Sequence, residues 1–194
     1  MVANPVTGLI LAGGAGSRMG GKDKGLLPYR GRPLIAHVIE RLAPQVTGLL
    51  ISANRNLDTY GAFGYPVLPD VLSDYQGPLA GLAAGLVACP TPWLLTCPCD
   101  CPDLPDDLVI RLFAAVENGR TNIAVASVAG YMQPTFQLCR REMLPELEAY
   151  LAAGGRKVGA WCREQGATVV DFPDASAFEN LNTPSDLLDL GSTR

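Results

Sequence analysis

The sequence predicts a doubly wound α/β protein with a mainly parallel sheet and one antiparallel strand. Short apolar segments rich in β-formers alternate with segments whose apolar residues recur at helical spacing, and the connections are short. Residues 93–97 are wholly apolar, as expected of a central strand covered on both faces. The 194 residues, 48% hydrophobic and 18% charged, are typical of one globular domain, which we expect to span 1–194.

The first half of the chain alternates strand and helix. Residues 6–11 form an apolar strand that runs into a glycine-rich loop. Pro33 then lies in the first turn of a helix whose apolar positions recur up to Leu42, and 47–53 is a second strand, which implies a right-handed crossover and parallel pairing. The elements predicted next are a short helix within 54–64, a strand at 65–68 and a small-residue helix at 78–89.

The second half contains the predicted antiparallel strand. The strand 93–97 ends at Asp100, and Asp106 and Asp107 begin a helix, where capping and the helix dipole explain two acidic residues. A turn at Gly130 joins a strand at 122–128 to one at 132–138, which we expect to be antiparallel. The remaining predictions are helices at 141–153 and 157–165, a strand at 167–172 and a terminal helix after Thr183.

Charge is distributed unevenly along the chain. The net charge of −4 argues against a nucleic-acid binder that neutralises phosphates over a broad surface. Residues 18–32, however, hold five cations against the single carboxylate of Asp23, which favours a small phosphorylated ligand. No apolar run approaches the ~18 residues needed to span a bilayer, and the N-terminus lacks the pattern of a signal peptide. We therefore expect a cytoplasmic protein without a membrane or nucleic-acid partner.

The six cysteines do not have the spacing of a zinc site. Cys97, Cys99 and Cys101 are separated by one residue each, whereas zinc ligands are usually two to four residues apart. The single histidine, His37, lies within an amphipathic helical pattern, and we expect it to be structural. Free, buried thiols in a reducing compartment are the expected state.

The glycine-rich loop within 11–25 does not match the two commonest phosphate-binding patterns. The dinucleotide fingerprint fails because Met19 occupies its last glycine position, and a P-loop fails because Asp23 stands where a hydroxyl should bind magnesium. The loop nevertheless combines backbone N–H groups with Arg18 and Lys24, which together suit a polyphosphate.

Several polar groups follow the predicted parallel strands, and ligands of such sheets bind where those strands end. The glycine loop, the segment 52–55, Asp70 and Asp100 are all expected at this edge. Asp100 can hold Mg²⁺, which bridges phosphates and neutralises their charge. The chain offers no Ser/His/Asp or Cys/His arrangement, so direct in-line attack of one substrate on another is simpler than a covalent intermediate.

The sequence resembles the molybdenum cofactor guanylyltransferases over nearly its whole length. The signature loop at 11–25 is shared with other nucleotidyltransferases, but the ordered set of motifs is far more specific. The further matching segments are Ser52-Ala-Asn-Arg55, Asp70, Gly77-Pro-Leu-Ala-Gly81, Cys97-Pro-Cys-Asp100, Gln133-Pro-Thr135 and Asn180-Leu-Asn-Thr-Pro184.

This resemblance implies a Rossmann-like nucleotidyltransferase fold and transfer of GMP from magnesium-bound GTP to the terminal phosphate of molybdopterin, with release of pyrophosphate. Lys24, Arg18 and Asp100 would be catalytic, Asp100 as the Mg²⁺ ligand. The implied GTP contacts are Leu11, Ala12, Gly13, Gly14, Lys24, Ser52, Asp70 and Asp100, and the implied molybdopterin contacts are Arg156, Asn180 and Asn182. Transient contact with molybdopterin-handling proteins or molybdoenzymes is also implied.

The residues themselves leave alternatives open. Ser52 stands where some relatives have Asn, Asp70 and the Asn180 loop also suit plain turns, and Arg156 could begin a surface helix. The alternative functions are a cytidylyltransferase or another nucleotidyltransferase of the same fold, and a non-catalytic module that binds nucleotide or molybdopterin. A comparison of GTP with CTP, and a test for pyrophosphate release, would separate them.

Overall fold

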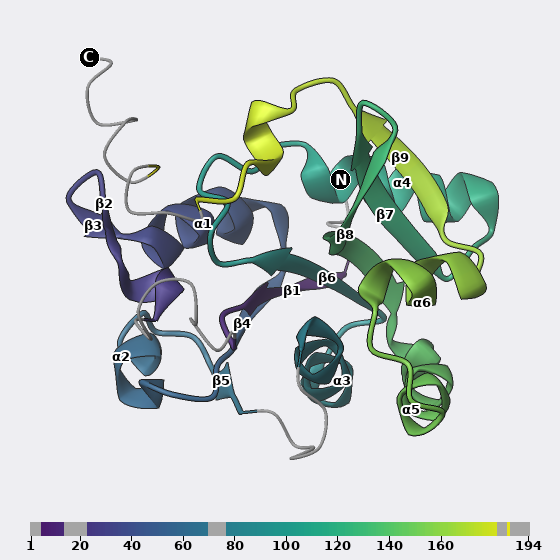
Figure 1. The fold of residues 1–194 in the computed structure, drawn as a ribbon, viewed down its shortest axis with the longest axis horizontal. Helices are drawn as coiled ribbons and strands as arrows, with labels where there is room; N and C mark the ends of the chain where they lie inside the picture. The colour runs from purple at the N-terminus through teal and green to yellow at the C-terminus, as the bar shows by residue number, and fades with distance from the viewer. Residues whose placement is uncertain (1–4, 14–22, 70–76, 182–185, 187–194) are drawn as a thin grey trace.

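A seven-stranded sheet forms the centre of the molecule, with helices on both faces (Figure 1). The computed structural model describes residues 5–13, 23–69, 77–181 and 186. The strand order is β5-β4-β1-β6-β8-β7-β9. The strands are β1 (Val6–Leu11), β4 (Gly48–Ser52), β5 (Val67–Leu68), β6 (Trp93–Pro98), β7 (Ile123–Val128), β8 (Tyr131–Arg140) and β9 (Thr168–Phe172).

The sheet is parallel except at β8, which runs antiparallel to β6 on one side and to β7 on the other. The predicted fold class, a mainly parallel sheet with one antiparallel strand, is therefore confirmed. The β7–β8 register shifts between Val125 and Ala126, so that Val125 faces Gln137 while Ala126 faces Gln133. This bulge removes Pro134, which lacks an N–H group, from regular pairing with β7.

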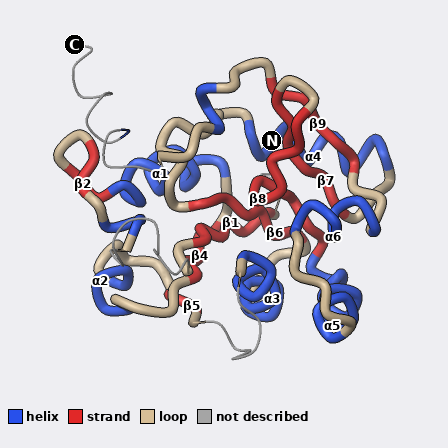
Figure 2. Tube along the Cα trace, viewed as in Figure 1, coloured by secondary structure: helices blue, strands red, loops and turns tan. Residues whose placement is uncertain are grey.

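The helices pack on the sheet in two groups. α1 (Leu34–Leu42) and α4 (Leu108–Gly119) cover one face, where their apolar residues meet alternate residues of β1 such as Val6 and Ile10. α3 (Pro78–Ala88), α5 (Leu144–Ala152) and α6 (Val158–Glu164) cover the other face around Leu9. Figure 2 shows these helices in blue on either side of the red sheet. Both faces of the central strands are thus buried, which explains their continuous apolar runs.

Helix α3 approaches the sheet unusually closely because its packing surface is made of small residues. A Cβ added at Gly85 would lie 2.5 Å from Leu9 Cδ2 and 2.8 Å from Leu94 Cδ2. Both leucines are fully buried, so neither can move aside into solvent. The predicted small-residue helix is therefore confirmed, together with the reason for its composition.

Some local details differ from the predictions. Residues before α1 form a small hairpin, β2 (Pro28–Tyr29) with β3 (Arg32–Pro33), which periodicity did not reveal, and Pro33 precedes α1 as its N-cap. Asp107 is the N-cap of α4 but makes no capping hydrogen bond. The N–H of Val109 donates instead to Oε1 of Gln45 at 3.1 Å, while Asp106 and Asp107 pair with Arg41 and Arg111.

The short elements complete the described chain. They are α2 (Leu57–Gly61) and the 3-10 helices η2 (Lys24–Leu26), η3 (Ala43–Gln45), η4 (Arg141–Met143) and η5 (Ser176–Phe178). The predicted terminal helix lies outside the described residues except for Asp186, which is helical. Within the part of the chain that the structure describes, each helix is too short or too polar to cross a membrane.

Candidate active site

The carboxyl ends of β1, β4 and β6 meet at one edge of the sheet, as predicted. Leu11 faces Ser52 of β4 on one side and Pro98 of β6 on the other. Hydrogen bonds continue past the strands: the N–H of Ala12 donates to the Ser52 carbonyl at 2.8 Å, and the N–H of Cys99 donates to the Leu11 carbonyl at 3.1 Å. The start of the glycine-rich loop is therefore attached to the segments that contain Ser52 and Asp100.

Lys24 and Asp100 form an ion pair at this edge. The Nζ of Lys24, in η2, donates to Oδ2 of Asp100, just beyond β6. Asp100 is 8% exposed, so the carboxylate is held where a nearby charge acts more strongly than in water. The structure thus brings together two candidate catalytic residues that are far apart in sequence, and it places them beside Leu11, Ala12 and Gly13.

Asp23, which is buried, belongs to a polar cluster with Tyr60, Asn56 and Arg55. Its carboxylate accepts hydrogen bonds from the hydroxyl of Tyr60 and from Nδ2 of Asn56, the latter at 3.1 Å. The Nε of Arg55 lies 3.6 Å from Asp23 Oδ2. A buried carboxylate must be paired to be tolerated, and these groups provide the pairing. Burial, together with the bond to the Asp23 carboxylate, raises the pKa of Tyr60 well above its ordinary value.

Gly25 allows η2 to approach this cluster. A Cβ at Gly25 would lie 2.7 Å from the hydroxyl oxygen of Tyr60 and 3.4 Å from Sγ of Cys99. A larger residue at position 25 would collide with Tyr60. The absence of a side chain at Gly25 therefore allows Asp23 to contact Tyr60 while Lys24 contacts Asp100. Asp23, the residue that excludes a P-loop, is explained as the anchor of η2.

The segment after η5 also reaches Asp100. The N–H of Leu181 donates to the Asp100 carbonyl at 3.0 Å, and Sγ of Cys101 donates to Oδ1 of Asn180 at 2.7 Å. Asn180, a candidate for the second substrate, is thus brought next to the candidate metal ligand. These contacts join residues about eighty positions apart in the sequence.

Arg156 occupies a different part of the molecule. It lies in the connection between α5 and α6, and its Nη1 donates to the carbonyls of Leu151 at 2.8 Å and Gly155 at 2.7 Å. Figure 1 draws this connection to the right of α3, whereas the segment after η5 lies near α1. In this structure Arg156 satisfies backbone carbonyls where α5 ends, which is a structural role. Its assignment to molybdopterin stays a prediction.

Four candidate residues lie outside the described residues: Gly14, Arg18, Asp70 and Asn182. Ser52 is described and is 2% exposed. It lies at the end of β4, opposite Leu11. The GTP contacts of Gly14, Ser52 and Asp70, the catalytic role of Arg18 and the molybdopterin contact of Asn182 stay predictions.

The cysteines are free thiols, as expected, and all six are buried. Burial raises the pKa of Cys97, Cys99 and Cys101 above the ordinary thiol value, and the nearby Asp100 carboxylate adds to this effect. No group of three or more His, Cys, Asp or Glu side chains in the described residues is arranged to hold a metal ion.

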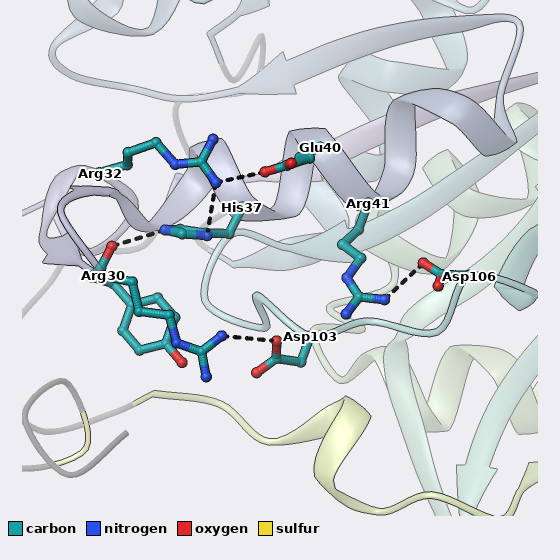
Figure 3. Close-up of polar contacts among 8 residues, drawn as sticks. Arg30, Arg32, His37, Glu40, Arg41, Asp103 and Asp106 are labelled. Carbon is teal, nitrogen blue, oxygen red and sulfur yellow. Dashed lines mark hydrogen bonds and ion pairs between the residues drawn. The ribbon is translucent and has the colours of Figure 1, made fainter. Parts of the chain in front are cut away.

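His37 is part of a polar network on the surface of α1 (Figure 3). Its Nε2 donates to the Tyr29 carbonyl at 2.8 Å, and Nη2 of Arg32 lies 3.4 Å from its Nδ1 and 2.6 Å from Glu40 Oε2. The imidazole therefore connects α1 to the β2–β3 hairpin, a structural role as predicted.

The donor chemistry of the site fits Mg²⁺ in one specific manner. Mg²⁺ is usually held by one or two carboxylates, several waters and the phosphates of a substrate, rather than by a complete protein cage. Asp100 supplies one buried carboxylate with a cation beside it. Among the described residues, the donor set therefore suits a metal that arrives with a polyphosphate.

Sequence reasoning did not identify Tyr60 and Cys101 as parts of the site. Tyr60 lies in a short helix that carries no recognisable motif, and Cys101 was considered only as a possible zinc ligand. Asp23, at the end of the glycine loop, indicates in the sequence that a polar partner lies elsewhere in the chain, because a carboxylate in a phosphate-binding loop has to be paired.

Comparison with known proteins identifies the family of this chain. The family model of the MobA-like NTP transferase domain matches residues 8–169. Molybdenum cofactor guanylyltransferase of Cupriavidus necator is 50% identical over 187 residues, 94% of each chain. The protein of the same name from Bordetella petrii is 50% identical over 189 residues, 95% of this chain and 96% of the relative.

Solved structures share the fold at lower identity. Molybdopterin-guanine dinucleotide biosynthesis protein A from Archaeoglobus fulgidus superposes with a TM-score of 0.74 at 22% identity, over 94% of this chain and 95% of that chain. CMP:2-keto-3-deoxy-manno-octonic acid synthetase in complex with CTP gives a TM-score of 0.77 at 16% identity, over 96% and 97%. Because the relatives match at half of all positions over nearly the whole chain, this chain belongs to the molybdenum cofactor guanylyltransferase family, within the MobA-like NTP transferases.

Proposed function

We propose that this protein transfers GMP from Mg²⁺-GTP to the terminal phosphate of molybdopterin, releasing pyrophosphate and forming molybdopterin guanine dinucleotide. The observation that carries this proposal is the partly buried Lys24–Asp100 pair at the carboxyl edge of the sheet, next to Asn180 and within this family. A cation and a metal-binding carboxylate at one point are what chemistry at a nucleotide phosphate requires.

In the proposed reaction an oxygen of the molybdopterin phosphate attacks the α-phosphorus of GTP. The new P–O bond forms as the bond from the α-phosphorus to the bridging oxygen breaks, and pyrophosphate leaves with that electron pair. Lys24 and Arg18 offset the negative charge on the transferring group and on pyrophosphate. Since both substrates are bound, their orientation lowers the barrier without a protein nucleophile.

The ion pair has a direct consequence for this reaction. Lys24 and Asp100 contact each other, so the two charges lie at one point of the sheet edge. In the proposed reaction Lys24 would contact a phosphate oxygen and Asp100 would hold the metal. When bound, Mg²⁺ would supply charge neutralisation at the phosphate oxygens.

The remaining contacts are proposed by family resemblance. Leu11, Ala12 and Gly13 would bind GTP through the backbone, with Gly14, Ser52 and Asp70. Arg156, Asn180 and Asn182 would face molybdopterin, of which Asn180 is supported by its position beside Asp100. The buried thiols suit a reducing compartment, and we propose the cytoplasm, with transient transfer of the product to molybdopterin-handling proteins or molybdoenzymes.

The direct test measures pyrophosphate release by the purified chain with molybdopterin, Mg²⁺ and either GTP or CTP. We expect release with GTP, dependent on Mg²⁺ and on molybdopterin. Release with CTP instead would identify a cytidylyltransferase. Nucleotide binding without pyrophosphate release would identify a non-catalytic module.

The role of Asp100 is tested by Asp100→Asn, which keeps the shape of the side chain but removes its charge. We expect kcat to fall by about 10²–10³, because a charged group that stabilises the transition state is lost. Asp103→Asn is the matched control. Asp103 lies in the same connection, but its side chain is 39% exposed and its Oδ1 lies 3.6 Å from Nη1 of Arg30. Near-normal turnover of folded Asp100→Asn would contradict the metal assignment.

A further inference from the structure

The segment that follows η5 is fixed on both sides of Asn180 by buried apolar residues. Phe178 is 5% exposed, and its ring centroid lies 4.8 Å from that of Phe136 and 5.2 Å from that of Phe172. Leu181 is 4% exposed and its N–H is bonded to the Asp100 carbonyl. Asn180 itself is exposed. The backbone at Asn180 is therefore held in place, while the orientation of its side chain needs a separate explanation.

Cys101 provides that explanation. Its thiol is fully buried, and Sγ donates to Oδ1 of Asn180 at 2.7 Å, closer than the Phe178 carbonyl oxygen at 3.7 Å. A carboxamide has an acceptor end and a donor end of nearly equal size, so shape alone does not select between its two orientations. A thiol with one proton to donate selects the oxygen end.

The two ends of the amide then have different roles. With Oδ1 bound to Cys101, the NH₂ group is turned away from the buried thiol. Because Asn180 is exposed, this group remains accessible as a donor of two hydrogen bonds. Donors of this kind bind phosphate and other anionic or carbonyl oxygens. The segment lies beside Asp100, at the edge where the acceptor phosphate has to approach.

We propose that Cys101 is a positioning residue, whose thiol holds the Asn180 carboxamide with its NH₂ group available to an oxygen of the acceptor substrate. This inference rests on the proposed function, in which Asn180 contacts molybdopterin. Cys101 would thus contribute to binding of the acceptor substrate through Asn180. It would not contribute to binding of GTP.

The test compares two variants that differ in one hydroxyl. Cys101→Ser replaces the thiol by a hydroxyl on a shorter bond, whereas Cys101→Ala removes the γ atom, so only serine retains a donor. We expect Cys101→Ala to raise the KM for molybdopterin by about threefold to tenfold, the effect of losing one neutral hydrogen bond, and to leave the KM for GTP unchanged. Cys101→Ser should remain within about twofold of the unsubstituted protein for both substrates.

Cys139→Ala is the matched control for loss of a buried thiol. Cys139 is fully buried in β8 on the face covered by α3, α5 and α6, and its Sγ contacts a backbone carbonyl of its own strand. We expect both KM values to be unchanged in this variant. A purely structural effect of removing a buried thiol would alter Cys139→Ala and Cys101→Ala alike.

A double-mutant cycle tests whether Cys101 acts through Asn180. In an Asn180→Ala background, Cys101→Ala should cause no further rise in the KM for molybdopterin. The same fold-change in both backgrounds would show that Cys101 does not act through Asn180 and would overturn the inference. Equal KM values for Cys101→Ser, Cys101→Ala and the unsubstituted protein would overturn it as well.

Two further measurements keep the result decisive. If Cys101→Ala does not fold, Cys101→Thr and Cys101→Val form a second pair of similar size, with and without a donor, for which the same contrast is expected. The unsubstituted protein is assayed first with GTP, molybdopterin and Mg²⁺. Absence of pyrophosphate release there contradicts the proposed function, whereas normal release with no contrast between the paired variants contradicts only the role of Cys101.

Discussion

Asp23 is the residue whose importance changes most between sequence and structure. In the sequence it only excludes a P-loop, because a carboxylate beside a phosphate is unfavourable. In the structure it is bound to Tyr60, Asn56 and Arg55, whereas the adjacent Lys24 pairs with Asp100. Adjacent acidic and basic residues thus point into different environments, and the anchoring of one helps to position the other.

This anchoring predicts a cost for Tyr60→Phe. The variant keeps the buried ring but leaves one acceptor of the Asp23 carboxylate unpaired, so we expect the free energy of unfolding to fall by about 1–3 kcal/mol. Urea denaturation measures this change. Tyr131→Phe is the control, because Tyr131 is 75% exposed and loss of its hydroxyl should have no measurable effect. An unchanged midpoint for Tyr60→Phe would show that Asp23 is satisfied without Tyr60.

At the scale of elements, helix α3 shows how composition and packing are related. Its many small residues were predicted to allow close packing on a sheet, and the structure adds which strands it approaches. Gly85 lies over Leu9 of β1 and Leu94 of β6. The close approach covers the central parallel strands, whose carboxyl ends carry Leu11 and, beyond β6, Asp100.

Two glycine-to-alanine variants should therefore have opposite effects. Gly85→Ala adds a methyl group where none fits, and we expect a loss of about 1–3 kcal/mol of stability even after the gain in helix propensity. Gly61→Ala, in α2, adds a methyl group with no atom within 4 Å, and its propensity gain of up to ~1 kcal/mol should remain. Thermal unfolding of both variants gives the comparison. A stable Gly85→Ala protein would mean that α3 can shift away from β1 at little cost.

At the scale of the whole molecule, the packing of helices on both faces of the sheet buries thiols on each face. Burial raises the pKa of Cys139 on one face and of Cys97 on the other, and raises the pKa of Cys162 to about 12. The folded protein therefore keeps these protons at pH values where an unfolded chain, with thiols near 8.5, releases them.

The sign of the resulting pH dependence follows from proton counting. Above about pH 8.5 the unfolded state binds fewer protons than the folded state, so stability decreases as pH rises. Each buried thiol contributes a loss of up to about 1.4 kcal/mol per pH unit until its folded pKa is reached. Urea midpoints measured between pH 7 and 10 should fall, and Cys139→Ala should reduce the slope. A midpoint that is constant up to pH 10 would show that the thiols ionise without unfolding.

The sequence by itself determined the fold class, the order of the elements and the edge of the sheet at which polar groups gather. Hydrophobic periodicity and the ends of apolar runs are local properties, so they can be read without the tertiary structure. The positions of Lys24 and Asp100 at that edge followed from the same reasoning, and the family resemblance supplied the chemistry.

Only the tertiary structure decided which side chains meet. The pairing of Lys24 with Asp100, of Asp23 with Tyr60 and of Cys101 with Asn180 joins residues between 37 and 79 positions apart. Such contacts depend on strand order and on how closely helices pack, and neither is encoded in a local pattern. The same reason applies to Arg156. In the sequence it is one more candidate cation, but in the structure it lies after α5, with its guanidinium bound to backbone carbonyls.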